Sequence, residues 1–210
     1  QTIDQARAGM VATSQAFPPS PAAVFEPVEA NGVPAEWVKV PGSGQAPVVL
    51  YFHGGGYCIG SAETHRDLVS RLCTVTGGRA LSVDYRLAPE HPAPAQLDDA
   101  LAACRWALGK SAELGGTSGR IAVAGDSAGA YLAARCGTTL NGGQRPIAAQ
   151  LLLYPFLQME RSDWSKPALH PARAVGRLAA GSIRRHLGAS GYPPILSFGL
   201  AAMPPTVLIS

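Results

Sequence analysis

Short apolar segments alternate with helix-like segments along this chain, and the alternation restricts the fold more than any other feature of the sequence. Apolar segments predict strands at residues 47–52, 79–85, 120–124, 148–153 and 205–209. Apolar residues spaced by three and four predict helices at residues 62–76, 96–114 and 128–140. Strands that alternate with helices pair in parallel and carry helices on both faces. The sequence therefore predicts an α/β fold with a mostly parallel sheet.

The N-terminal part predicts a helix followed by an antiparallel hairpin. Residues 2–16 place apolar side chains on one helix face, and the prolines at 18–19 end that helix. Strands at 24–29 and 33–40 flank an Asn-Gly pair at 31–32, which is the strongest short signal for a hairpin turn. We expect this hairpin to lead into the parallel sheet.

One domain accounts for the length of the chain. A sequence of 210 residues lies within the usual range of a single domain. Residues 159–200 interrupt the strand–helix order and contain one helix-like stretch, at about 173–187, among Pro, Gly and Ser. We expect a single domain over residues 1–210, with a small helical cap formed by residues 1–20 and 159–200.

The composition excludes several classes of protein. Apolar residues make up 47% of the chain and charged residues 15%, which excludes a disordered chain. The net charge of +3 is too small to indicate binding to nucleic acid or to an anionic membrane. No apolar run approaches the roughly 18 residues that span a bilayer. We therefore expect no nucleic-acid partner and no stable membrane anchor.

The cysteines predict neither a zinc site nor a disulfide framework. They are widely spaced and form no Cys-x-x-Cys pair, so a structural zinc is not expected. Each lies in an apolar context, at Cys58, Cys73, Cys104 and Cys136. Buried free thiols of this kind are typical of a reducing compartment, and we expect a cytoplasmic protein.

The pentapeptide Gly125-Asp126-Ser127-Ala128-Gly129, here called the serine turn, follows a predicted strand and begins a predicted helix. A G-x-S-x-G sequence in that context is typical of a nucleophile held on a sharp turn. A side chain at either glycine would collide with a neighbouring strand or helix. The helix N-terminus, beginning with Ala128, offers free N–H groups to a developing anion. The alternative is a glycine-rich strand-to-helix turn with a capping serine.

The sequence His53-Gly54-Gly55-Gly56-Tyr57, here called the glycine loop, directly follows another predicted strand. Three consecutive glycines cost conformational entropy, and they suit a site where the backbone itself must face a ligand. An oxyanion hole has that requirement, and we expect the N–H groups of Gly55 and Gly56 to be donors, with that of Ala128 as a third. The alternatives are a flexible loop or a phosphate cradle, but a phosphate cradle would require a Lys followed by Ser or Thr.

Residues 84–95 (DYRLAPEHPAPA) predict a stiff loop after the strand at 79–85, because three prolines occur within six residues. Asp84, Arg86 and Glu90 offer charged groups that could fix this loop. A catalytic base is one interpretation of the histidine between Glu90 and Pro92. We prefer a structural role for it, since His91 precedes Ser127 in the chain.

These three blocks, at residues 53–57, 84–95 and 125–129, resemble those of the hormone-sensitive-lipase-like carboxylesterases, a family with the α/β-hydrolase fold. The resemblance extends over nearly the whole chain, and the blocks follow the family's order and spacing. It implies a serine nucleophile at Ser127, with His53, Gly54, Gly125, Asp126 and Gly129 as supporting motif residues. It also implies that neither a metal nor an organic cofactor takes part.

The other two members of a catalytic triad have no clear position in this sequence. The resemblance implies an Asp after the strand that begins at Pro205 and a His after one further strand. The Asp and His residues that follow Ser127 are all in the cap-like segment, at Asp163, His170 and His186. We assign none of them, and expect the catalytic acid and base, with a further helix and strand, beyond Ser210.

Two classes of function follow from these motifs. The first is a serine carboxylesterase that hydrolyses small esters with short to medium acyl chains, and that could form a homodimer. The second is a catalytically inactive small-molecule binding protein or receptor with the same fold, since some relatives keep the glycines and the serine without the catalytic histidine. A purely structural fragment would not explain why the glycine loop and the serine turn occur together.

Overall fold

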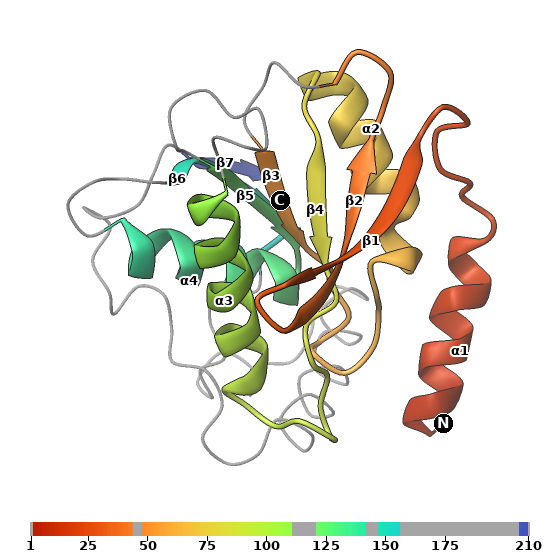
Figure 1. Cartoon of the computed structure of the whole chain (residues 1–210). Coiled ribbons are helices and arrows are strands. Elements are labelled where there is room, and N and C mark those ends of the chain that lie inside the picture. The colour runs from red at the N-terminus through yellow and green to blue at the C-terminus, as the bar shows by residue number, and fades with distance from the viewer. Residues whose placement is uncertain (1, 44–47, 111–120, 142–146, 156–205, 210) are drawn as a thin grey trace.

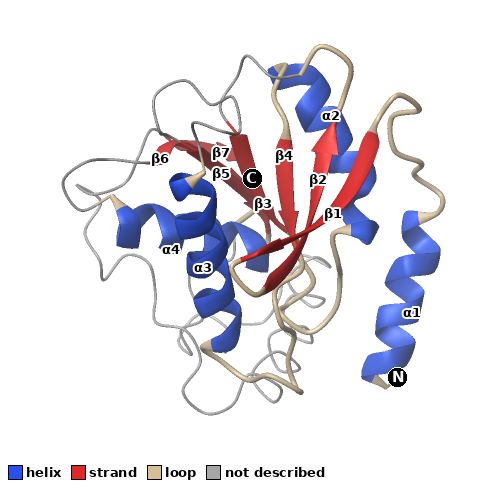
Figure 2. Ribbon diagram, in the orientation of Figure 1, coloured by secondary structure: helices blue, strands red, loops and turns tan. Residues whose placement is uncertain are grey.

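A single seven-stranded sheet organises the described part of the chain in the computed structural model (Figures 1 and 2). The structure describes residues 2–43, 48–110, 121–141, 147–155 and 206–209. The strands lie in the order β1-β2-β4-β3-β5-β6-β7. Their bounds are β1 Val24–Ala30, β2 Val33–Lys39, β3 Val48–Phe52, β4 Ala80–Val83, β5 Ile121–Asp126, β6 Ile147–Leu153 and β7 Thr206–Ile209.

The helices occupy the predicted segments, with differences at their ends. Their bounds are α1 Ile3–Ser14, the short 3-10 helix η1 Glu63–His65, α2 Arg66–Thr76, α3 Ala95–Gly109 and α4 Ala128–Leu140. The helix expected at 62–76 thus begins with a 3-10 turn. The helix expected at 96–114 is described to Gly109, since residues 111–120 lie outside the described part. The cap-like segment 159–200, with its expected helix at 173–187, lies outside it as well.

The sheet is parallel except at the hairpin, as the sequence predicts. Strands β1 and β2 pair antiparallel, β2 is antiparallel to β4, and the other neighbouring pairs are parallel. The hairpin turn places Asn31 at φ 58° and Gly32 at φ 82°. Positive φ at both central residues is the type I′ geometry that matches the twist of two paired strands, which explains the Asn-Gly pair.

Helices cover both faces of the sheet (Figure 1), and an apolar core lies between the helices and the sheet on each face. Side chains alternate along β3, so that Leu50 and Phe52 pack beneath α3 and α4, while Val49 and Tyr51 pack toward α2. All five residues of β3 are buried. This two-sided burial explains why the strand has a continuous apolar sequence instead of alternating apolar and polar residues.

Three further observations on the described residues concern the cysteines, membrane spans and metal sites. The four cysteines are unpaired and buried, which confirms the prediction of buried free thiols. No helix in the described segments is long and apolar enough to cross a membrane. The described residues also contain no cluster of His, Cys, Asp and Glu with the arrangement of a metal site.

The order of the strands decides where the chemical motifs meet. Strands β3 and β5 are parallel neighbours, with Phe52 paired to Gly125. The glycine loop begins directly after β3, and the serine turn lies where β5 ends and α4 begins. Both motifs therefore lie at the same edge of the sheet. In an open α/β sheet this carboxyl edge is the usual place for ligand binding.

Candidate active site

Ser127 occupies the sharp turn between β5 and α4 that the sequence predicts. Its backbone has φ 49° and ψ −112°, and its N–H donates to the carbonyl of Leu153 at 3.0 Å. A non-glycine residue with such positive φ costs on the order of 1–3 kcal/mol and persists only where the surrounding structure holds it. The side chain is half-buried. The hydroxyl has no hydrogen-bond partner among the described residues.

The two glycines of the serine turn are required by the crowding that the sequence predicts. A Cβ at Gly129 would contact the Phe52 carbonyl oxygen and lie 2.5 Å from the carbonyl oxygen of His53. A Cβ at Gly125 would lie 2.6 Å from that same Phe52 oxygen and 2.5 Å from the Gly129 backbone. The start of α4 is therefore packed directly on the end of β3, and this contact places the serine turn beside the glycine loop.

The Gly55 carbonyl is bound by the turn that follows the glycine loop. The Gly55 carbonyl accepts hydrogen bonds from the N–H groups of Cys58 and Ile59, both at 3.1 Å. Gly55 has a φ of 115°, which only glycine adopts without strain. Gly56 has a φ of 59°, which disfavours other residues. A Cβ on Gly55 would also contact the Ile59 carbonyl oxygen. The structure therefore explains the glycines as backbone requirements.

The N–H groups of Gly55 and Gly56 are left available by this arrangement. In a trans peptide the carbonyl and the following N–H point in opposite directions, so the Gly56 N–H points away from the turn at Cys58 and Ile59 that binds the Gly55 carbonyl. Neither N–H has a hydrogen-bond partner among the described residues. These properties suit donors to a developing oxyanion, although the assignment of Gly55, Gly56 and Ala128 to that role stays a prediction.

Asp126 lies buried between the two motifs. Its Oδ1 accepts hydrogen bonds from the Tyr51 hydroxyl at 2.7 Å and from the Gly54 N–H at 2.8 Å. His65 Nε2 lies 3.4 Å from the same oxygen. Burial by itself would raise the pKa of Asp126, but these contacts outweigh burial and lower the pKa below its usual range. The carboxylate is therefore ionised at neutral pH.

His53 is a buried neutral imidazole. Its Nδ1 lies 2.7 Å from the carbonyl oxygen of Gly54, and its ring stacks on Tyr85 with centroids 4.3 Å apart. Burial, followed by repulsion from His65, lowers the pKa of His53 to about 4. A carbonyl only accepts, so Nδ1 carries the proton and Nε2 is an acceptor. Nε2 has no hydrogen-bond partner among the described residues. His53 thus binds the Gly54 carbonyl of the glycine loop from a buried position.

The proline-rich loop at residues 84–95 is fixed by its charged groups, as the sequence predicts. Asp84 accepts from the Ala62 N–H at 2.6 Å, and Arg86 forms a forked ion pair with Asp99. Glu90 pairs with Arg7 of α1, whose guanidinium lowers the pKa of Glu90 to about 2. The histidine that follows Glu90 is exposed. Its backbone carbonyl accepts from the Gln96 side chain at 2.6 Å, which agrees with a structural role for His91.

Three side chains that hold these loops have no signal in the sequence. Tyr51 belongs to an apolar strand, His65 ends a 3-10 turn, and Arg7 lies on an N-terminal helix. Each meets its partner across a large separation in the chain, so periodicity does not reveal the contact. The remaining triad candidates, Asp163, His170 and His186, lie outside the described residues. The predicted nucleophile and oxyanion donors thus lie within the described residues, and no described histidine is within hydrogen-bond distance of the Ser127 hydroxyl.

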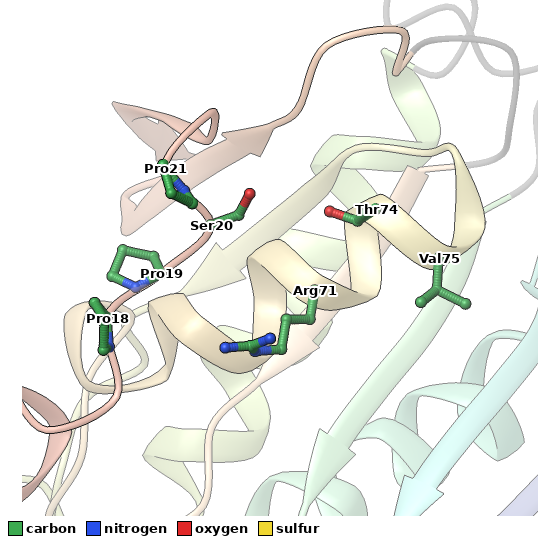
Figure 3. Close-up of a pocket in the computed structure, with 7 residues that line it drawn as sticks. All are labelled: Pro18, Pro19, Ser20, Pro21, Arg71, Thr74 and Val75. Atoms are coloured by element: carbon green, nitrogen blue, oxygen red, sulfur yellow. The ribbon is translucent and has the colours of Figure 1, made fainter.

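A groove of about 550 Å³ lies elsewhere on the molecule, between the segment before β1 and helix α2 (Figure 3). It is lined by Pro18, Pro19, Ser20, Pro21, Arg71, Thr74 and Val75. Helix α2 begins near the carboxyl edge of the sheet and runs back toward the opposite edge. The groove borders the second half of α2, so it is not part of the site around Ser127.

Comparison with known proteins agrees with this arrangement. A family model described as the alpha/beta hydrolase fold matches residues 49–192, which include both motifs. The chain belongs to the α/β-hydrolase family. An esterase from the bacterial hormone-sensitive lipase family superposes with a TM-score of 0.78 at 35% identity, covering 99% of this chain and 71% of its own. The resemblance to hormone-sensitive-lipase-like esterases and the predicted fold class are thereby confirmed.

Curated relatives of this α/β-hydrolase have names of the same kind. Esterase LipI from Mycobacterium tuberculosis is 40% identical over 177 residues, which are 80% of this chain and 55% of LipI. Carboxylesterase NlhH from the same organism is 53% identical over 119 residues, which are 55% of this chain and 37% of NlhH. The chain thus spans about half or less of the length of these relatives.

Proposed function

We propose that this α/β-hydrolase is a serine carboxylesterase that acts on small esters with short to medium acyl chains. The observation that carries the proposal is the position of Ser127. It lies on a strained turn at the N-terminus of α4, beside a loop in which the N–H groups of Gly55 and Gly56 have no partners among the described residues. The names of the relatives, esterase and carboxylesterase, support the same reaction class.

The reaction proceeds in two stages in this proposal. The Ser127 hydroxyl loses its proton to a general base as its oxygen attacks the ester carbonyl, and the N–H groups of Gly55, Gly56 and Ala128 stabilise the oxyanion. The alkoxide leaves as an alcohol after it receives the proton, and an acyl-enzyme remains. Water then attacks the acyl-enzyme and releases the acid. The base is outside the described residues, and every other group named here lies in the serine turn or the glycine loop.

Other parts of the proposal concern the surroundings of the site. We propose that residues 1–20, which include α1, form part of a cap together with residues 159–200. A homodimer and a cytoplasmic location remain predictions. Apart from Asp126, the serine turn and the glycine loop contain no side chain that is charged at neutral pH, and Asp126 is bound to the Gly54 N–H. A neutral ester suits these surroundings.

The test is ester hydrolysis by the complete protein and by its Ser127→Ala variant, with p-nitrophenyl esters of graded acyl length. We expect the variant to lose several orders of magnitude in kcat, as other triad nucleophiles do, with little change in KM. Ser43→Ala is the matched control, since Ser43 lies in the turn after β2 at the opposite edge of the sheet. A fluorophosphonate probe should label Ser127.

Two results would contradict the proposal. One is near wild-type turnover by the Ser127→Ala variant, which would mean another nucleophile. The other is a wild-type protein that neither hydrolyses the esters nor reacts with the probe, yet binds small uncharged ligands in a calorimeter. That result would favour the second hypothesis, a catalytically inactive binding protein with this fold.

A further inference from the structure

One carboxylate oxygen connects three separate segments beneath the glycine loop. Asp126 Oδ1 accepts from the Gly54 N–H in the loop and from the Tyr51 hydroxyl in β3. It also faces Nε2 of His65, at the end of η1, at 3.4 Å. Asp126 is itself the residue before Ser127. The same side chain therefore contacts the loop that carries the predicted oxyanion donors and belongs to the turn that carries the predicted nucleophile.

The contact with Gly54 is close enough to set the orientation of its peptide groups. A Cβ on Gly54 would collide with the Asp126 carboxylate, so this glycine allows the approach. The Gly54 N–H is held by Asp126, and the Gly54 carbonyl is held 2.7 Å from His53 Nδ1. With both of its backbone polar groups bound, Gly54 has one orientation. The Gly55 N–H, which points opposite to the Gly54 carbonyl across a planar trans peptide, has one orientation as well.

The charge of the carboxylate adds to this geometry. A hydrogen bond to an ionised acceptor is roughly twice as strong as one between neutral groups. Asp126 is also buried, with 6% of its surface exposed, so water does not compete for Oδ1. An amide in its place would still accept from Gly54, but it would lose the charge that faces His65. Removal of the side chain would leave the Gly54 N–H and the Tyr51 hydroxyl without their buried partner.

We propose that Asp126 is a positioning residue that aligns the Gly55 N–H with the oxyanion formed at Ser127, and that Tyr51 and His65 hold its carboxylate in place. The inference rests on the proposed esterase function and adds a role for Asp126 beyond the spacing of the motif. Asp126 does not touch the reacting atoms in this proposal. It acts through Gly54, and its loss weakens binding of the transition state more than binding of the substrate.

The experiment compares Asp126→Asn and Asp126→Ala in the complete protein with p-nitrophenyl butyrate. We expect kcat to fall about tenfold in the Asn variant and about 10²–10³-fold in the Ala variant, the range for one lost oxyanion donor. KM should change less than about threefold. The affinity for an alkylboronic acid, which forms a tetrahedral adduct on the serine, should fall in parallel with kcat/KM. Asp98→Asn, on the exposed surface of α3, is the matched control.

Further measurements separate positioning from a loss of folding. Thermal unfolding of each variant shows whether the fold persists, and Tyr51→Phe removes one donor to Oδ1 while leaving the ring in the core. We expect Tyr51→Phe to lower kcat about three- to tenfold. As in Asp126→Asn, KM should change little and the affinity for the boronic acid should fall in parallel with kcat/KM. Folded Asp126→Asn and Tyr51→Phe variants with wild-type kcat and boronate affinity would overturn the inference.

The proposed function and this inference fail in different ways. If Ser127→Ala keeps its activity, or if the wild type has none, the esterase proposal is wrong irrespective of Asp126. If Ser127→Ala is inactive while both Asp126 variants keep wild-type kcat, the esterase proposal stands and the positioning role of Asp126 is wrong. A rise in KM with kcat unchanged would also contradict the positioning role, because it would indicate lost substrate binding.

Discussion

At the scale of single residues, the site depends on glycines that allow backbone segments to touch. Gly129 is the clearest case, because an added Cβ would lie 2.5 Å from the His53 carbonyl oxygen and would also meet that of Phe52. Backbone atoms of a buried strand cannot move aside cheaply. We expect Gly129→Ala to lower the free energy of unfolding by about 1–3 kcal/mol, the usual cost of overpacking, and to lower kcat. Thermal unfolding and ester hydrolysis measure the two effects.

The control for this substitution is Gly9→Ala, at an exposed position in α1. An added Cβ at Gly9 meets nothing within 4 Å, and its φ is not positive. Replacing a glycine inside a helix by alanine favours the helix by up to about 1 kcal/mol. The Gly9→Ala variant should therefore unfold at the same temperature as the wild type or slightly above it. Equal unfolding temperatures for Gly129→Ala and Gly9→Ala would contradict the crowding at the start of α4.

At the scale of elements, α1 differs from α2, α3 and α4, each of which buries several of its residues. None of its residues is fully buried. Arg7 donates to the backbone carbonyls of Cys58 at 2.9 Å and Ala88 at 3.1 Å, and it pairs with Glu90. The forked ion pair is partly exposed, so we attribute the attachment to the pair together with the two carbonyl contacts. We expect Arg7→Ala to increase hydrogen exchange of the α1 amides at least about tenfold, while the strands stay protected.

Two further variants test whether the shape of the arginine matters. Arg7→Lys should not restore protection of α1, because an ammonium group cannot reach several acceptors with a planar fork. Arg71→Ala should leave exchange unchanged, since its ion pair with Asp67 is on the surface of α2 with 67% of the Arg71 side chain exposed. The attachment would have another cause if the α1 amides of the Arg7→Ala variant exchanged at the wild-type rate.

At the scale of the whole molecule, the sequence is sufficient to predict the fold and both loops, but not the contacts that hold them. Strands and helices follow from apolar spacing, because the strands at the centre of a parallel sheet are buried on both faces. The contact of Asp126 with the Gly54 N–H joins residues 72 apart in the chain, and no periodicity encodes it. The short helix η1 was not predicted either. The Ala62 N–H before it is bound by Asp84, which is 22 residues away in the chain, and periodicity does not encode such a contact.

The two apolar cores should unfold together, because they share the strands between them. Cys73 packs in the core beneath α2, and Cys104 in the core beneath α3 and α4, on the other face of the sheet. Burial raises the pKa of Cys73 to about 11 and that of Cys104 well above its usual range, so neither thiol reacts in the folded protein. Both should become reactive at the same denaturant concentration.

Pulsed labelling of the complete protein with a methanethiosulfonate, read by peptide mass spectrometry along a denaturant series, measures the two midpoints. Cys58 provides an internal contrast, because it follows the glycine loop and is 6% exposed, whereas Cys73 and Cys104 are 1% and 0% exposed. Local opening of the loop should therefore label Cys58 at lower denaturant than the other two.

Along β3, Leu50 and Phe52 pack in one core and Val49 and Tyr51 in the other, so neither core can lose its strands alone. Labelling of Cys73 well before Cys104 would mean that α2 leaves the sheet independently, and the sheet would then not unfold as one cooperative unit.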